Sequence, residues 1–164
     1  LRLKADTVEP EHADSLTTII PDMIATMRDA GGVGLAAPQI GISLRLMIFE
    51  VPVSRATNLD GDKPCDIQVL INPSYNPATS AKELGWEGCL SIPGFNETIS
   101  RPDKIELKWQ DINGNEHNEE PEGLLTVCIQ HEIDHLEGKL MVDYVSALKR
   151  DRIRSKLLKD FKRK

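Results

Sequence analysis

Residues 130–135 read Gln-His-Glu-Ile-Asp-His (QHEIDH), within an apolar helical pattern that runs from 123 to 136. Residues four positions apart lie on one face of a helix, so we expect His131 and His135 to direct their imidazoles at one metal ion. Glu132 follows the first histidine and is close enough to move a proton for a reacting water molecule. Because apolar residues surround the motif, we predict a buried helix, and we disfavour a surface helix that carries two unrelated histidines.

Helix and strand patterns lie on both sides of this segment. Residues 13–29 carry apolar side chains at helical spacing, and Pro21 is expected to kink this helix or to start a second segment. Strands are predicted at 44–53, 67–71, 82–88, 97–100 and 104–110, with a polar loop at 54–66, a strand end at Asn72-Pro73, a turn at Asn113-Gly114 and a last helix at about 146–162. A helix, several strands and two further helices indicate the α+β class.

Composition limits the class of protein. The chain has 164 residues, 40% hydrophobic and 28% charged, which is typical of a globular protein and favours a single domain over 1–164. No apolar run reaches the roughly 18 residues of a membrane span, and no signal-peptide pattern opens the sequence. Cysteines occur at 65, 89 and 128, and this odd number argues against a disulfide framework and for a cytoplasmic protein.

Charge is distributed unevenly along the chain. Residues 149–164 hold nine Lys/Arg and two Asp/Glu, a balance of +7, which leaves −13 for the rest of a chain whose net charge is −6. An acidic body with a basic tail suggests that only the tail meets an acidic partner, although a charged helix end is often simply solvated.

Two more segments carry candidate functional residues. EGCLS at 87–91 contains Cys89 next to Gly88, and a Cys-His-His set leaves a fourth metal position open, as a catalytic site needs. GVGLAAPQ at 32–39 combines small residues, which allow close backbone approach, with the amide of Gln39. Taken singly, Cys89 is equally a small buried hydrophobe, and 32–39 an ordinary turn. A downstream carboxylate as the third ligand would instead indicate another class of zinc peptidase.

Together the three segments resemble the signature motifs of peptide deformylases, in the same order and at similar spacing. The resemblance covers essentially the whole chain. It implies an enzyme that removes the formyl group from the N-terminal formyl-methionine of new polypeptides. It also implies mixed or antiparallel sheets around a central metal-binding helix, with a C-terminal helix. About ten residues are expected to precede Leu1, where members of the family usually carry a first short strand.

The resemblance assigns a role to each site residue. The metal ligands are Cys89, His131 and His135; Glu132 is the proton shuttle; the Gln39 amide and the Leu90 backbone N–H stabilise the oxyanion. Peptide backbone binds near Val33, Gly34 and Gly88, the methionine pocket is formed by Leu90, Leu124, Val127, Cys128 and His131, and Arg101 pairs with Glu87. Asn96 departs from the family, which commonly has Arg there, and this puts any substrate contact of that Arg in doubt.

The metal and the partners are expectations of the same kind. The resemblance favours Fe(II), the ligand types also suit Zn(II), and Ni(II) or Co(II) are possible. It points to ribosome docking through the helix at 146–162 and to no membrane partner. A non-catalytic deformylase-like binding protein is the remaining alternative, and the intact Gln39, Cys89 and Glu132 argue against it.

Overall fold

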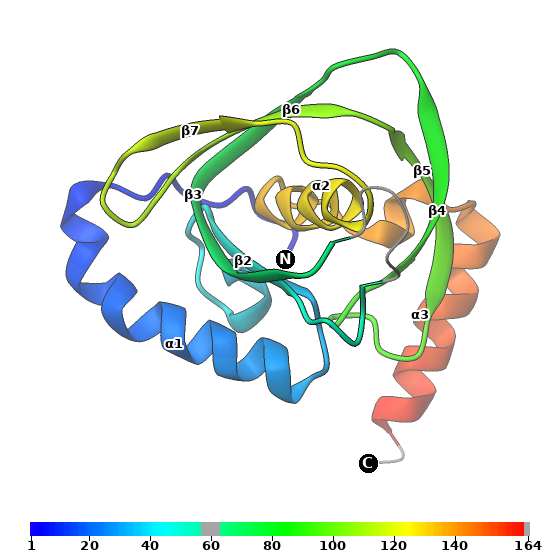
Figure 1. Cartoon of the computed structure of the whole chain (residues 1–164). Helices are drawn as coiled ribbons and strands as arrows, with labels where there is room; N and C mark the ends of the chain where they lie inside the picture. The colour runs from blue at the N-terminus through cyan, green and yellow to red at the C-terminus, as the bar shows by residue number, and fades with distance from the viewer. Residues whose placement is uncertain (57–62, 163–164) are drawn as a thin grey trace.

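A computed structural model describes residues 1–56 and 63–162 of the chain. Helix α2 (Leu124–Leu136) lies at the centre, with strands on several sides of it (Figure 1). Ten of its 13 residues are buried. The prediction of a buried helix at 123–136 is confirmed, and so is the α+β class.

Two antiparallel sheets enclose this helix. The larger sheet has the order β1 (Gly34–Ala36), β2 (Leu46–Val51), β3 (Cys65–Pro77), β6 (Ile105–Gln110), β7 (Glu116–Glu119), and the smaller pairs β4 (Lys82–Gly88) with β5 (Asn96–Pro102). Successive residues of a strand point to opposite faces. Met47 and Phe49 of β2 therefore join the core around α2, whereas Leu46 and Ile48 join a second core on the other face. Burial of both faces explains why β2 is apolar throughout.

Helix α1 (Ala13–Asp29) covers that second face of the large sheet (Figure 1). Its buried residues Leu16, Ile20, Met23 and Met27 recur at helical spacing. Pro21 lies inside one continuous helix, so a second segment does not start there. A proline costs one backbone hydrogen bond in a helix. Burial of the apolar side chains on both sides of Pro21 offsets that cost.

Strand β3 continues through Asn72-Pro73, so the predicted strand end there is wrong. The pairing register with β6 shifts between Ile71 and Ser74, which marks a bulge. Asn72 adopts a left-handed conformation with φ 52, and its side chain bonds the N–H and the carbonyl of Val8 at 2.8 and 3.0 Å. Pro73, which lacks an N–H, falls within the bulge, where no ladder hydrogen bond is required.

Other predicted boundaries differ by a few residues. Strand β2 is shorter than 44–53, and β5 is longer than 97–100. Of the predicted loop 54–66, residues 57–62 lie outside the described part, and Cys65 and Asp66 already belong to β3. Strands β1 and β7 were not predicted. β7 has the sequence EHNE, which lacks apolar alternation because it forms the outer edge of the sheet.

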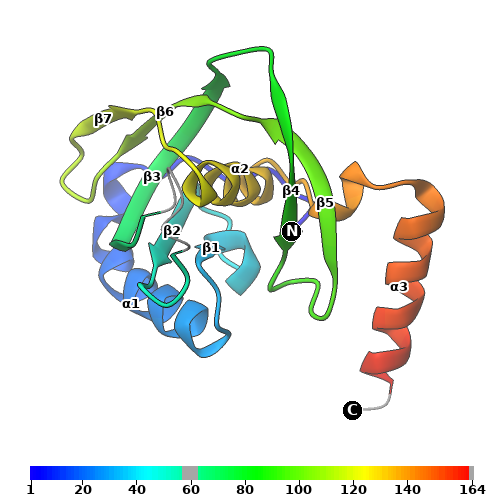
Figure 2. The ribbon, with the colours of Figure 1, turned by 45° about the vertical axis from the view of Figure 1, so that its right-hand side comes forward.

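The last helix, α3 (Ala147–Phe161), runs beside the small sheet and away from the body (Figure 2). The 3₁₀ helices η1 (Pro10–His12), η2 (Ala37–Ile40) and η3 (Met141–Tyr144) complete the described elements. Ile153 and Leu157 of α3 pack with Cys89 and Ile92, and Lys149 forms an ion pair with the buried Glu97. In the described part of the chain, no helix is both long and apolar enough to cross a membrane.

Candidate active site

Helix α2 and the end of β4 bring three potential metal ligands together. His131 and His135 lie on one face of α2, and Cys89 follows β4 directly. Their ligand atoms all lie within 4.8 Å of one another, and Cys89 Sγ is 3.3 Å from His135 Nε2. His131 Nδ1 bonds Glu87 Oε2 at 2.8 Å, which leaves the Nε2 atom of His131 as its ligand atom.

These residues fit a divalent transition-metal ion. One thiolate and two imidazoles are donors that such ions accept, and three protein ligands leave a position for a reactant. All three side chains are buried, and His135 Nδ1 has no hydrogen-bond partner among the described residues. The acidic side chains downstream of His135 form no such cluster in residues 1–56 and 63–162.

Glu132 is a buried carboxylate beside this cluster. Its Oε2 atom is buried without a hydrogen-bond partner in the described part of the chain. Burial is the main cause that raises the pKa of Glu132, to about 7. A carboxyl with a pKa near 7 both accepts and releases protons close to neutral pH.

The two histidines have opposite electrostatic surroundings. Burial opposes the charge on His131, but hydrogen bonds to Cys89 and Glu87 outweigh it and raise its pKa to about 10. Burial and the nearby charge of His131 lower the pKa of His135 to about 3. Positive charge is therefore favoured on His131, beside Cys89 and Glu87, and disfavoured on His135.

Gln39 is held so that its amide nitrogen faces the EGCLS segment. Its Oε1 accepts a hydrogen bond from the Ala36 N–H at 2.8 Å, and its Nε2 donates to Ser91 Oγ at 3.1 Å. The second hydrogen of that nitrogen is left for another acceptor. Among the described residues, the backbone N–H of Leu90 has no backbone acceptor.

A cavity of about 540 Å³ opens beside these groups. Its wall contains Val33, Gly34, Gln39, Gly88, Cys89, Leu90, Leu124, Val127, Cys128, His131 and Glu132. Of the three potential metal ligands, Cys89 and His131 line this cavity and His135 does not; Arg101 does not line it either. A methyl group on Gly34 would come within 2.7 Å of Cys128 Sγ and 2.8 Å of Glu132 Oε1, so β1 approaches α2 as closely as a glycine allows.

Several further residues on the wall were not singled out as site residues from the sequence. They include Arg55, Trp86, Phe95 and Pro93. Trp86 is 74% exposed and precedes the EGCLS motif, so its type and position gave a signal. Arg55 lies in a polar loop that has no pattern. Asn96 also lines the cavity, and its Oδ1 lies 2.6 Å from where a Gly88 side chain would begin.

Behind His131 lies a buried ion-pair network. Arg101 donates to Glu87 Oε1 and Oε2 at 2.5 and 2.8 Å and to Asp134 Oδ2 at 2.8 Å. Burial opposes ionisation of Glu87, but hydrogen bonds from Arg101 and His131 outweigh it and lower its pKa. The structure thus brings the expected pair together and adds Asp134 to it.

An HExxH helix that meets a cysteine from a neighbouring sheet, beside an open cavity, defines a class of metal-dependent hydrolases. Comparison with known proteins gives the family. The polypeptide deformylase family matches residues 1–151. A peptide deformylase of Pseudomonas aeruginosa is 47% identical over 146 residues, which are 89% of this chain and 82% of that protein. The peptide deformylase of Zymomonas mobilis is 44% identical over 162 residues, 99% of this chain and 89% of its own.

Solved structures agree with this result. The crystal structure of a peptide deformylase from Legionella pneumophila has a TM-score of 0.83 and 43% identity, covering 99% of this chain and 89% of that one. That of Ehrlichia chaffeensis in complex with actinonin has a TM-score of 0.85 and 37% identity, covering 98% and 91%. The chain belongs to the polypeptide deformylase family. It is an enzyme that removes the formyl group from an N-terminal methionine.

Proposed function

We propose that Cys89, His131 and His135 hold one divalent ion and that the neighbouring residues perform the deformylation. The convergence of three ligand atoms within 4.8 Å, beside the buried Glu132, carries this assignment. When bound, such an ion polarises a carbonyl and lowers the pKa of water.

In the proposed reaction, Glu132 removes a proton from the attacking water and delivers it to the leaving nitrogen. The unpartnered Oε2 atom supports this role, because no described side chain competes for the proton. The free hydrogen of the Gln39 amide and the Leu90 N–H stabilise the developing negative charge on the formyl oxygen. One such donor typically contributes about 10²–10³ in rate.

We propose that the substrate chain enters as an extended strand between two sheet edges. Strand β1 ends the large sheet, and β4 pairs only with β5 among the described strands. Both strands lead to the cavity, through Gly34 and Gly88. Backbone pairing there binds peptides of many sequences. The methionine side chain occupies the apolar wall formed by Leu124, Val127 and Cys128.

We propose Fe(II) as the native ion, with Zn(II) next, and Ni(II) or Co(II) as functional replacements. The test is formate release from formyl-Met-Ala-Ser by protein loaded with each metal under anaerobic conditions. We expect the iron form to turn over fastest. A faster zinc form in the same assay contradicts the assignment of iron.

The close approach of β1 to α2 gives a testable prediction. Gly34→Ala is expected to lower kcat/KM by about 10- to 100-fold, because a methyl group there displaces Glu132 and Cys128, and small displacements of reacting groups are costly. Gly85→Ala is the matched control, since the nearest atom to its added methyl is 3.9 Å away. Equal kcat/KM values for the two variants contradict the prediction.

We propose that the chain forms one domain over 1–164 and acts in the cytoplasm. There, α3 docks on ribosomal RNA when the enzyme meets nascent chains. Part of its charge is already engaged: Lys149 pairs with Glu97, Arg150 lies 3.9 Å from Asp143, and Lys156 lies 5.0 Å from the Phe95 ring centroid. Arg152, Arg154 and Lys159 are exposed and form no ion pair within the described part.

The prediction therefore concerns these three residues. Replacing Arg152, Arg154 and Lys159 by Gln is expected to weaken ribosome binding and to reduce its log–log salt slope by roughly 2–3, because each phosphate contact releases counterions. Hydrolysis of a short formyl-peptide should be unchanged. Truncating α3 is a poorer test, since it also removes Ile153 from the core beside Cys89.

The matched control replaces the exposed Lys82, Lys104 and Lys108 by Gln, outside α3. Cosedimentation at two salt concentrations measures the effect. If both triple variants cosediment equally, α3 is not the docking element.

A further inference from the structure

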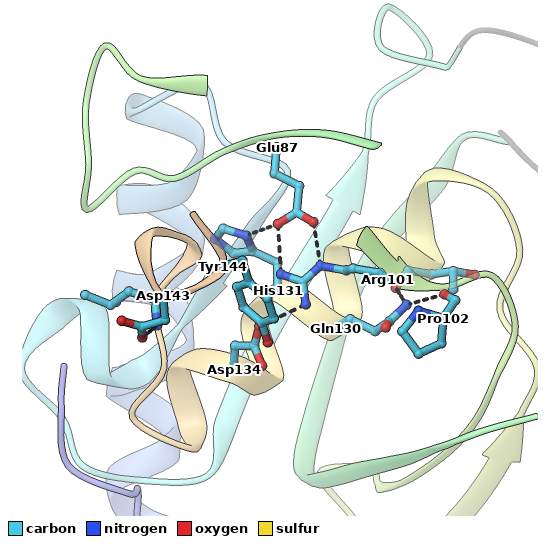
Figure 3. Close-up of polar contacts among 10 residues, drawn as sticks. Glu87, Arg101, Pro102, Gln130, His131, Asp134, Asp143 and Tyr144 are labelled. Atoms are coloured by element: carbon cyan, nitrogen blue, oxygen red, sulfur yellow. Dashed lines mark hydrogen bonds and ion pairs between the residues drawn. The ribbon is translucent and has the colours of Figure 1, made fainter. Parts of the chain in front are cut away.

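The network behind His131 continues beyond the expected Glu87–Arg101 pair to the surface of the molecule. Figure 3 shows its members, which in order from the site outward are His131, Glu87, Arg101, Asp134 and Tyr144. The Tyr144 hydroxyl donates to Asp134 Oδ2 at 2.7 Å. The same oxygen accepts from Arg101 Nη1 at 2.8 Å. Four contacts thus join a tyrosine of η3 to the imidazole of a proposed metal ligand.

Tyr144 touches the network at two points. Besides its bond to Asp134, its ring lies under the Arg101 guanidinium, with 5.1 Å between Arg101 Cζ and the ring centroid. It is also the outermost member: Tyr144 is 44% exposed, whereas Glu87, Arg101 and Asp134 are buried. Burial and the bond to Asp134 raise the pKa of Tyr144, so its hydroxyl stays protonated and remains a donor.

The geometry explains why a hydroxyl is needed at this place. The two donors converge on one oxygen of Asp134. Without the tyrosine donor, that oxygen keeps only its bond to Arg101 Nη1, and the Asp134 carboxylate is then free to turn about its last bond and to draw Arg101 with it. Glu87 accepts hydrogen bonds from the other two nitrogens of the Arg101 guanidinium, Nε and Nη2, so a shift of Arg101 is transmitted to Glu87 Oε2, which bonds His131 Nδ1. A partner of this kind fixes the ring orientation of a ligating histidine.

The position of η3 adds a second reason. Asp143, next to Tyr144, bonds Arg2 Nη1 at 2.5 Å and accepts from the Leu140 N–H at 2.9 Å. These contacts hold η3 against the N-terminal segment, so Tyr144 presents its hydroxyl from a fixed backbone. The residue is therefore placed to hold the network in one arrangement.

We propose that Tyr144 is a positioning residue for His131, acting through Asp134, Arg101 and Glu87. Its hydroxyl sets the orientation of the imidazole and so how tightly the site retains its ion. This inference rests on the proposed ligand role of His131.

The test compares Tyr144→Phe with wild type by two measurements. The first is the ¹H–¹⁵N signal of the His131 Nδ1 proton shared with Glu87, in zinc-loaded protein. The second is the rate at which the cobalt-loaded protein loses Co(II) to a chelator, together with its visible absorption bands. In Tyr144→Phe we expect the proton signal to shift or broaden and the absorption bands to shift. We expect Co(II) to be lost about 10-fold faster, which is the lower end of the effect typical of residues that support a metal ligand.

Tyr75→Phe is the matched control. Tyr75 is the other tyrosine of the chain, and it packs against the core around α2. Burial is the main cause that raises the pKa of Tyr75, and the nearby charge of Asp134 raises it further. Among the described residues its hydroxyl makes no hydrogen bond. We expect wild-type signals from this variant.

The proposal is overturned if Tyr144→Phe has the same proton signal and the same rate of Co(II) loss as wild type. Equal changes in Tyr144→Phe and Tyr75→Phe also overturn it, and so does a lower melting temperature of Tyr144→Phe with unchanged spectra. If wild type itself retains no Co(II), the ligand assignment fails. The His131 proton signal of the metal-free protein then still decides whether Tyr144 positions the ring.

Discussion

Replacing Glu132 by Gln is expected to lower kcat by about 10²–10⁴, because a positioned proton shuttle typically contributes that much. The substitution keeps the size of the side chain and removes its ability to accept a proton. Glu132 of α2 is buried, and its Oε2 atom has no hydrogen-bond partner among the described residues. An amide at this place has the same volume, so we expect the fold and the metal content to stay as in wild type.

The measurement is turnover of formyl-Met-Ala-Ser at saturating substrate, with metal content determined on the same sample. If the variant retains the metal but loses turnover, Glu132 acts as a proton shuttle and not as a ligand. Turnover within a few-fold of wild type, in a variant that holds one ion per chain, would refute the role of Glu132. Loss of the ion from this variant would instead indicate that Glu132 is a ligand.

Cys89→Ala is expected to abolish both tightly bound metal and turnover. The thiol supplies one of the three ligand atoms that lie within 4.8 Å of one another. The two remaining imidazoles are too few to hold an ion through dialysis, because tight catalytic sites use three protein ligands. The change removes one atom from the small core shared with Ile92 and Ile153, so the chain should remain folded.

Cys65→Ala provides the control. Cys65 is a free, half-buried thiol at the start of β3, and it does not line the cavity. We expect this variant to keep one ion per chain by elemental analysis after dialysis. A Cys89→Ala protein that retains one tightly held ion would contradict the Cys-His-His assignment.

Features that depend on local spacing can be predicted without the fold. The fourfold spacing of His131 and His135 places them on one face of any helix, whatever surrounds it. The apolar period of 13–29 likewise identified α1, and its bounds agree with the structure. The three motifs, through their resemblance to peptide deformylases, identify the family from the sequence alone.

Features that depend on long-range pairing appear only in the folded chain. β3 passes through Asn72-Pro73 because Val8, 64 positions earlier, bonds the Asn72 side chain. β7 forms because β6 offers it an edge, although EHNE alone has no strand pattern. In both strands the local sequence pattern predicts the wrong structure, because contacts with distant residues determine it.

The site shows the same division. The ligand types can be read from the sequence, but Cys89 lies next to His135, 46 positions away, only because β4 ends beside α2. The link from Tyr144 through Asp134 to Arg101 also needed the packed fold, since β5, α2 and η3 contribute one member each. Periodicity fixes which side chains share a face of one element. Which elements meet is fixed by burial of their apolar faces, a property of the whole chain.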